Sequence, residues 1–225
     1  TMIRAARSSI RRYSASGSGP KPSAKPKLTG AKTFGARPGS EFLFTLTATG
    51  AKPMAFSAKG LPAGLTLDSK TGIVTGRVQK PGTYTVEVSA TNAKGVAKRD
   101  WKVVIGSKIS LTPPMGWNHW NCWGIDIDQQ KALSSARAMA LHLKDHGWTY
   151  VNIDDGWQGL RGGPFTAIMP NKKFPDYKAM CDEIHAMGLK VGIYSTPWKR
   201  SYGSHIGGYF HWTLVDNWEW AEGYR

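Results

Sequence analysis

The stretch HGWTYVNIDDGWQG, residues 146–159, decides the fold of the second half of this chain. Val151 and Ile153 alternate with polar residues as they do in a strand, and two adjacent carboxylates, Asp154 and Asp155, follow at once. Adjacent anions repel each other, and strand interiors disfavour Asp. The sequence therefore predicts a strand that ends here and presents both carboxylates at its carboxyl end.

Amphipathic helices are expected on both sides of this strand. One covers residues 128–147, with Asp128 as its N-cap and Gly147 after its last turn, and the other covers residues 176–187. A further strand follows in LKVGIYST, residues 189–196. Alternating strands and helices with short connections imply parallel strands joined by right-handed crossovers. All strands then end on one face, where ligands usually bind, and that rim carries Trp120, Asn121, Asp154, Asp155 and Tyr194.

Paired carboxylates among aromatic side chains suit a polyhydroxylated ligand. Carboxylates accept hydrogen bonds and sugar hydroxyls donate them, and such charge-assisted bonds are about twice as strong as neutral ones. Two structural interpretations stay open at this point. Asp-Asp-Gly is also an ordinary turn signal, and Trp120 and Tyr194 could serve packing alone.

No metal or cofactor site is expected from the sequence. The two cysteines, Cys122 and Cys181, form no CxxC pattern, and two cysteines make neither a disulfide framework nor a structural zinc site. Oxygen-ligated metals usually recruit carboxylates from more than one loop, and Asp126 and Asp128 lie on a different rim loop from Asp154.

Residues 37–106 have a different periodicity, and we expect them to form a separate all-β domain. FLFTLTATG, MAFSAKG, GTYTVEVSATN and DWKVVIG read as strands, with turn residues between them, as in residues 68–72 and 92–95. Short strands with frequent turns predict a β-sandwich. The pattern changes at Gly106, so residues 107–225 are expected to form the second domain.

Residues 1–36 are expected to form a basic, disordered tail. The chain has a formal net charge of +15, and residues 1–40 hold nine Lys and Arg and no acid, which leaves +6 for the rest. Such a Ser/Gly/Pro-rich segment buries too little surface to fold, and we interpret it as a solvated tether, with weak polyanion contact as the alternative. This distribution argues against nucleic acid as a partner. No apolar run is long enough for a transmembrane segment, and no secretory signal is visible.

Three blocks in the second half resemble the opening of glycoside hydrolase family 27, the α-galactosidase or melibiase family: LTPPMGWNHWNCWG, HGWTYVNIDDGWQG and PNKKFPDYKAMCDEIHAMGLKVGIYSTPW. The resemblance implies a (β/α)8 TIM barrel that cleaves terminal α-linked galactose with retention of configuration and without a cofactor. It implies that Trp120 lines the pocket, that Asp154 and Asp155 hold the galactose O4 and O6 hydroxyls, and that Tyr194 lies beside the nucleophile.

The first half has a resemblance of its own. LPAGLTLDSKTGIVTGRV, followed by PGTYTVEVSATNAKG, is similar to a small immunoglobulin-like domain often fused to bacterial surface proteins and glycan-cleaving enzymes. This resemblance implies a fold and not an activity.

The sequence departs from family 27 in two places. Animal secreted members have a cysteine directly after the paired aspartates, where this chain has Gly156, so that disulfide is not expected. The family's nucleophile lies in a Lys-Tyr-Asp or Lys-Phe-Asp motif on the fourth strand, and no such motif follows Tyr194; Asp216 is the nearest candidate. A full barrel takes about 250 residues, so we expect a truncated barrel whose nucleophile and acid/base lie beyond Arg225 and which hydrolyses nothing alone.

We therefore interpret the chain as an immunoglobulin-like sandwich followed by the first βα units of a bacterial α-galactosidase-type barrel, secreted or periplasmic by resemblance. Specificity for α-N-acetylgalactosaminides or β-L-arabinopyranosides stays open, as does the oligomeric state. The alternative is a non-catalytic carbohydrate-binding or surface-attachment protein, or an inactive remnant. A Lys-Tyr-Asp or Lys-Phe-Asp block in the coding sequence after residue 225 would favour the enzyme.

Overall fold

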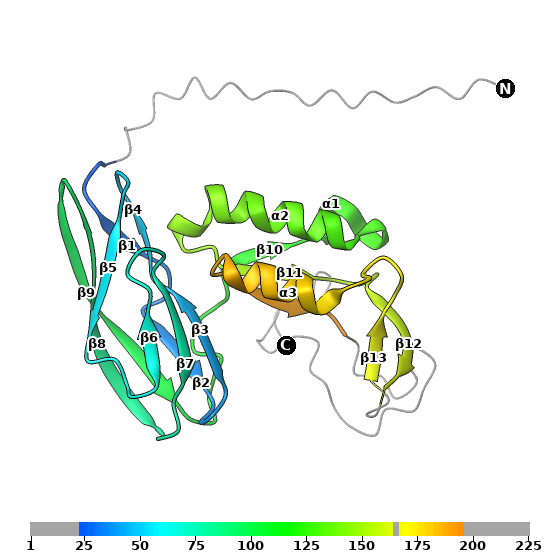
Figure 1. Ribbon diagram of the computed structural model, residues 1–225, viewed down its shortest axis with the longest axis horizontal. Coiled ribbons are helices and arrows are strands. Elements are labelled where there is room, and N and C mark those ends of the chain that lie inside the picture. Colours follow the sequence, from blue (N-terminus) through cyan, green and yellow to red (C-terminus); the bar gives the residue numbers. More distant parts are fainter. Residues whose placement is uncertain (1–22, 164–166, 196–225) are drawn as a thin grey trace.

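The computed structural model describes residues 23–163 and 167–195 as two parts that lie side by side (Figure 1). Residues 27–105 contain strands throughout, and residues 116–193 alternate strands with helices. The prediction of an immunoglobulin-like β-sandwich followed by the first βα units of a barrel is confirmed. No helix within these described ranges is long and apolar enough to span a membrane.

The sandwich consists of two sheets around one core. One sheet has the order β2-β9-β8-β5 and the other β3-β7-β6, while β1 pairs with β4. At the centre, Phe44 stacks on the fully buried Trp101, with ring centroids 4.5 Å apart. The strands are β1 (Lys27–Thr29), β2 (Thr33–Ala36), β3 (Glu41–Thr45), β4 (Thr47–Thr49), β5 (Ala55–Lys59), β6 (Leu65–Leu67), β7 (Ile73–Arg77), β8 (Gly82–Asn92) and β9 (Gly95–Ile105).

The sandwich begins earlier than the boundary we expected at residue 36. β1 and β2 occupy part of the segment that we assigned to the tail. Leu28, Ala31 and Phe34 pack against the core, so this segment does contribute apolar surface in spite of its neighbouring lysines. The two strands are too short for their alternation to be a clear signal in the sequence. Residues 1–22 of the predicted tail lie outside the described residues.

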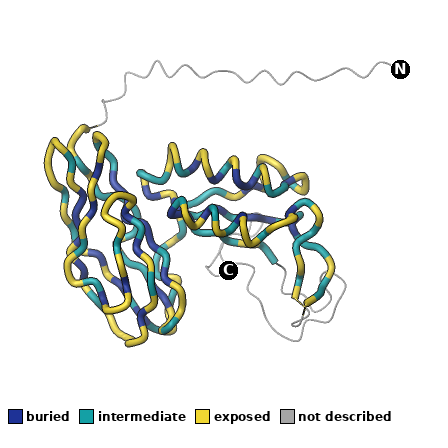
Figure 2. Tube along the Cα trace, in the orientation of Figure 1, coloured by how far each residue is buried: buried dark blue, intermediate teal, exposed yellow. Residues whose placement is uncertain are grey.

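The second part is built on three parallel strands in the order β10-β11-β14. Helices α2 and α3 share one core with these strands, and Figure 2 shows each helix buried on one side and exposed on the other. The elements are β10 (Gly116–Asn118), α1 (Trp120–Trp123), η1 (Gly124–Asp126), α2 (Gln129–His142), η2 (Lys144–His146), β11 (Tyr150–Ile153), β12 (Gln158–Gly162), β13 (Ala167–Pro170), α3 (Tyr177–Ala186) and β14 (Lys190–Ile193). β12 and β13 form a hairpin between β11 and α3.

An aspartate caps the start of each long helix. The Asp128 carboxylate accepts a hydrogen bond from the backbone N–H of Lys131 at 2.8 Å, which satisfies one of the free donors of the first turn. At the start of α3, the Asp176 carboxylate accepts a hydrogen bond from the backbone N–H of Ala179 at 2.8 Å. α2 ends at His142, because the chain tightens into the 3₁₀ turn η2, as helix ends often do. Gly147, which we expected after the last helical turn, follows η2 in the left-handed conformation.

The sandwich packs against the loops that lead into β11 and β14. Thr45 Oγ1 donates a buried hydrogen bond of 2.6 Å to the carbonyl of Gly188. Gly147 allows close backbone approach, because a Cβ at this position would lie 2.7 Å from Gly30 Cα. The sandwich therefore covers the amino ends of these strands, and their carboxyl ends lie at the opposite edge of the sheet (Figure 1).

Candidate functional site

Asp154 directly follows β11 and is 9% exposed. Its Oδ2 accepts a hydrogen bond from Asn118 Nδ2 at 2.7 Å, and its Oδ1 accepts one from the backbone N–H of Asp155 at 2.7 Å. Within the described ranges, no Lys, Arg or His forms an ion pair with it. The carboxylate is thus held by neutral donors and keeps lone pairs with which it can accept further hydrogen bonds.

Asn118 is a site residue that the sequence analysis missed. It is the last residue of β10 and links two candidate residues, because its Nδ2 donates to Asp154 and its Oδ1 accepts from the backbone N–H of Trp120 at 2.9 Å. We named Asn121 instead, which lies exposed in α1. No signal in the sequence separates the two, because Asn118 is placed by its parallel pairing with Asn152, two residues before Asp154, which the folded sheet provides.

Asp155 and Gly156 form a tight turn at the end of β11. The backbone N–H of Gly156 donates to Asp155 Oδ1 at 2.8 Å and to Gln158 Oε1 at 3.0 Å. Asn171, from the segment after the hairpin, donates to the carbonyl of Gly156 at 2.8 Å. Gly156 has a φ of +100°, a conformation that strains other residues, so a cysteine at this position would not fit without cost.

Tyr194 follows β14 and extends its pairing with β11. Its backbone N–H donates to the carbonyl of Ile153 at 2.8 Å. Its own carbonyl accepts from the indole N–H of Trp157, a buried residue of the turn after Asp155, at 2.8 Å. The structure therefore places Tyr194 next to the strand end that carries the paired carboxylates.

Trp120 begins α1 and is 39% exposed. Beside it lies the fully buried His119, whose ring centroid is 6.4 Å from that of Trp120. Neither ring nitrogen of His119 finds a hydrogen-bond partner among the described residues. Burial lowers the pKa of this imidazole, although Asp154 acts in the opposite direction. The ring is therefore neutral near pH 7 and packs beside the indole as an uncharged group.

The rim offers hydrogen-bond acceptors and aromatic surface. Two neighbouring carboxylates can accept from adjacent hydroxyl groups, and an indole face can cover an apolar C–H surface. In the part of the chain that the structure describes, no three His, Cys, Asp or Glu side chains gather closely enough to bind a metal ion. Asp216, our nearest candidate for a nucleophile, lies outside the described residues, as does Trp198 at the end of the third block.

Two protein families match the chain, in the order that the sequence indicated. Residues 25–105 match the family described as "Putative Ig domain", and residues 112–222 match the family described as "Alpha galactosidase A". The "Probable alpha-galactosidase B" of Talaromyces emersonii is 48% identical over 93 residues, which are 39% of this chain and 21% of the relative. The "Alpha-galactosidase A" of Cellvibrio japonicus is 42% identical over 90 residues, 39% of this chain and 22% of the relative.

Two solved structures from Bacteroides fragilis NCTC 9343 resemble both parts of the chain together. One is described as a "putative alpha-galactosidase" and is 39% identical, with a TM-score of 0.75 over 83% of this chain and 41% of that chain. The other, a "putative alpha-galactosidase/melibiase", is 38% identical, with the same TM-score and coverage. This chain therefore spans about a fifth of the length of the curated relatives and about two fifths of these solved chains.

Proposed function

The second half of this chain belongs to the α-galactosidase family of glycoside hydrolases, and on that premise we propose that it forms the sugar-holding part of an enzyme that hydrolyses terminal α-linked galactose. The relatives' descriptions support a carbohydrate substrate. In this proposal Trp120, Asp154, Asp155 and Tyr194 hold the galactosyl unit, with the roles that the family resemblance implies.

The setting of Asp154 carries the proposal. A carboxylate this far buried normally has a cationic partner, yet Asp154 accepts its hydrogen bonds from the amide of Asn118 and from a backbone N–H. A site arranged in this way tolerates the charge because ligand hydroxyls, or water in their absence, complete its hydrogen bonds. Asp155 lies next in the chain and offers a second acceptor for a neighbouring hydroxyl.

These residues orient the sugar and do not break the glycosidic bond. Retaining enzymes use two carboxyl groups about 5–5.5 Å apart that flank the scissile bond, whereas neighbours at one strand end approach the sugar from one side. Hydrogen bonds to hydroxyls away from the reacting carbon supply binding energy that positions that carbon. The nucleophile and the acid/base belong to residues outside the described ranges.

The test is hydrolysis of a nitrophenyl α-galactoside by the complete gene product. Asp155→Asn keeps the shape and removes the charge, and a hydrogen bond to a charged group is worth roughly 1.5–3 kcal/mol. We therefore expect kcat/KM to fall by about 10- to 150-fold. The expected effect appears in steady-state kinetics while the circular dichroism spectrum stays unchanged.

Asp182→Asn is the matched control. The same chemical change is made there on the exposed face of α3, where the carboxylate forms a surface ion pair with Lys178, and such pairs contribute little. Its kcat/KM should equal that of the parent. If Asp155→Asn behaved like Asp182→Asn, the carboxylate would have no part in holding the substrate.

A further inference from the structure

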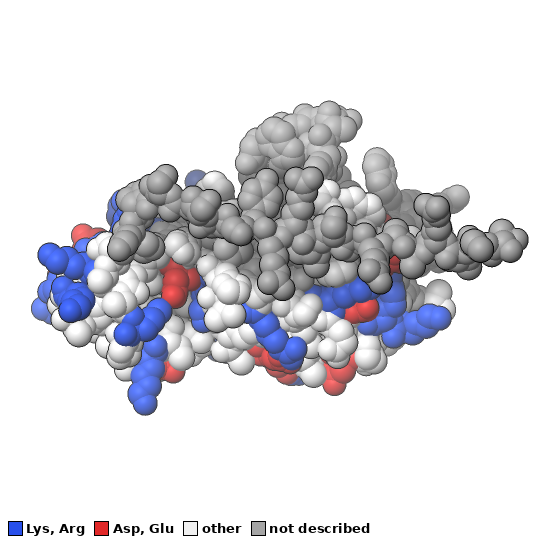
Figure 3. All heavy atoms as spheres, turned by 90° about the horizontal axis from the view of Figure 1, so that it is seen from above, with Lys and Arg blue, Asp and Glu red and all other residues white. Residues whose placement is uncertain are grey.

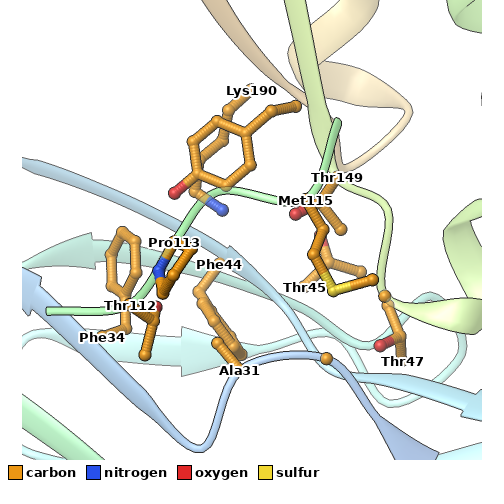
Figure 4. A pocket seen from close by; sticks show the side chains of 13 residues that line it. Ala31, Phe34, Phe44, Thr45, Thr47, Thr112, Pro113, Met115, Thr149 and Lys190 are labelled. Atoms are coloured by element: carbon orange, nitrogen blue, oxygen red, sulfur yellow. The ribbon is translucent and has the colours of Figure 1, made fainter. Parts of the chain in front are cut away.

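A cavity of about 200 Å³ lies between the sandwich and the amino ends of β11 and β14, away from the carboxylate rim. Phe34 and Phe44 line it from the sandwich, and Met115, Tyr150 and Lys190 line it from the second part. Figure 4 shows the ammonium of Lys190 reaching into the space between these two walls. The cavity is thus formed by the packing of the two parts.

Lys190 begins β14 and is surrounded by aromatic rings. Its Nζ lies 4.9 Å from the ring centroid of Phe34, 5.2 Å from that of Phe44 and 4.9 Å from that of Tyr150. Such cation–π contacts stabilise the charge but provide no acceptor for the three N–H donors of the ammonium. No carboxylate in the described part of the chain pairs with Lys190.

The positive charge of Lys190 lowers the stability of the folded state. Burial lowers the pKa of Lys190 to about 8, so the side chain is still mostly protonated at pH 7. Lys190 is half-buried, and a partly desolvated cation without a carboxylate destabilises the folded state, whereas an apolar residue of similar length would fill the same space at a lower cost. Packing alone therefore does not explain why a lysine occupies this position.

We propose that this cavity is a binding site for a small organic carboxylate, which accepts hydrogen bonds from Lys190 and packs its apolar body against Phe34, Phe44 and Met115. One ammonium matches one carboxylate, whereas a dianion such as phosphate would bring a second charge. The other polar side chains that line the cavity carry hydroxyls only: Thr45, Thr47, Thr112 and Thr149, besides the phenol of Tyr150.

The size of the cavity limits the ligand to about one ring. Pockets for drug-sized ligands are about 300–1,000 Å³, while an apolar cavity of about 150 Å³ accommodates benzene. Benzoate, a single ring with one carboxylate, therefore suits the space as a probe. Because a bound anion would contact both parts at once, it should also stabilise the folded chain.

The experiment compares benzoate with benzyl alcohol, which has nearly the same shape and no charge. In calorimetric titrations of the 225-residue chain at pH 7, we expect benzoate to bind at least about tenfold more tightly, since it gains a hydrogen bond to a charged group. Lys190→Met and Lys190→Gln should each abolish this preference. Lys52→Met is the control, because Lys52 is a cation of the same interface, paired with Asp145 at 2.8 Å, that does not line the cavity.

Three results would overturn the proposal. The first is that both probes bind the parent chain with equal affinity. This comparison uses the parent chain alone and so does not depend on whether a variant folds. The second is benzoate affinity that survives both substitutions of Lys190. The third is that benzoate does not bind at all, which would mean that the cavity holds only water.

Discussion

Asn118 contacts both the carboxylate of Asp154 and the backbone of Trp120. Asn118→Ala removes the amide donor from a buried charge, at a cost of roughly 1.5–3 kcal/mol, and leaves the start of α1 without its acceptor. We expect kcat/KM of the complete gene product on a nitrophenyl α-galactoside to fall by at least about tenfold. Asn121→Ala should lower kcat/KM less than Asn118→Ala does, because the Asn121 side chain lies exposed in α1. A larger loss for Asn121→Ala would contradict the structural assignment.

The turn after the paired carboxylates requires a glycine at position 156. Its φ is +100°, and a Cβ would lie 3.1 Å from the carbonyl oxygen of Ile125. Gly156→Ala should therefore lower the free energy of unfolding by about 1–3 kcal/mol, measured by urea denaturation. Gly106→Ala is the control, because a Cβ there meets no atom within 4 Å. Equal stability of the two variants would show that the turn tolerates a side chain.

The sequence could identify the paired carboxylates but not the amide that holds one of them. Asp154 and Asp155 stand directly after a clear strand pattern, and this fixes them at the strand end. β10 has three residues inside the aromatic segment GWNHW, and no periodicity shows where it stops. The choice between Asn118 and Asn121 therefore depended on parallel register, which only the folded sheet provides.

At the scale of elements, the start of α2 depends on Asp128. Burial alone would raise the pKa of this carboxyl, but hydrogen bonds from the backbone and side chain of Lys131 outweigh it, so the pKa is lowered. Asp128→Ala should lower the free energy of unfolding by about 1 kcal/mol at pH 7, as the loss of an N-cap residue usually does. The charged carboxylate is the form that the fold favours, so its contribution is present above pH 4 and is lost as the pH falls.

The measurement is the difference in unfolding free energy between parent and Asp128→Ala at several pH values from 7 to 3. The difference should shrink below about pH 4, near the ordinary pKa of Asp. Asp126→Ala, an exposed carboxylate two residues earlier, should change stability by no more than about 0.5 kcal/mol. A difference for Asp128→Ala that stays constant with pH would show that the charged form is not what caps the helix.

Long periodic segments were predicted well, and short ones were not. The helices α2 and α3 and the parallel strands β11 and β14 follow from apolar spacing and from aspartate caps that are visible in the sequence. β1 and β2 have three and four residues and lie in a lysine-rich segment, so their burial against the sandwich core was not apparent. What decided their place was tertiary packing of Leu28 and Phe34.

In the whole molecule, a buried hydrogen bond is among the contacts that join the two parts. Thr45 Oγ1 donates to the carbonyl of Gly188 across 143 positions of sequence. Thr45→Val keeps the shape and leaves that carbonyl unpaired, at a cost of about 1–3 kcal/mol. We expect scanning calorimetry to show a lower Tm and a transition that separates into two, because the parts are less tightly coupled.

Thr66→Val is the matched control for the interface. Its hydroxyl is exposed on β6 and makes only a long contact of 3.5 Å to the carbonyl of Thr75. The variant should unfold like the parent. If Thr45→Val and Thr66→Val had the same Tm, the bond between the parts would contribute nothing to stability.

The docking of the sandwich could not be predicted from the sequence. It depends on Thr45 at the end of β3 and on Gly147 and Gly188 in two separate loops, and these residues belong to no common pattern. The same holds for the cavity at Lys190, whose aromatic neighbours come from both parts. Sequence periodicity reports on single elements, whereas these features arise where two folded surfaces meet.

We propose that the paired carboxylates at one strand end hold the hydroxyls of a galactosyl unit, and the affinity of this chain for two sugars that differ only at C4 tests this proposal most directly. In calorimetric titrations, methyl α-galactoside should bind at least about tenfold more tightly than methyl α-glucoside, since the axial O4 keeps a charge-assisted hydrogen bond. Asp154→Asn should remove that preference. Equal affinity for the two sugars in the parent chain would contradict the account.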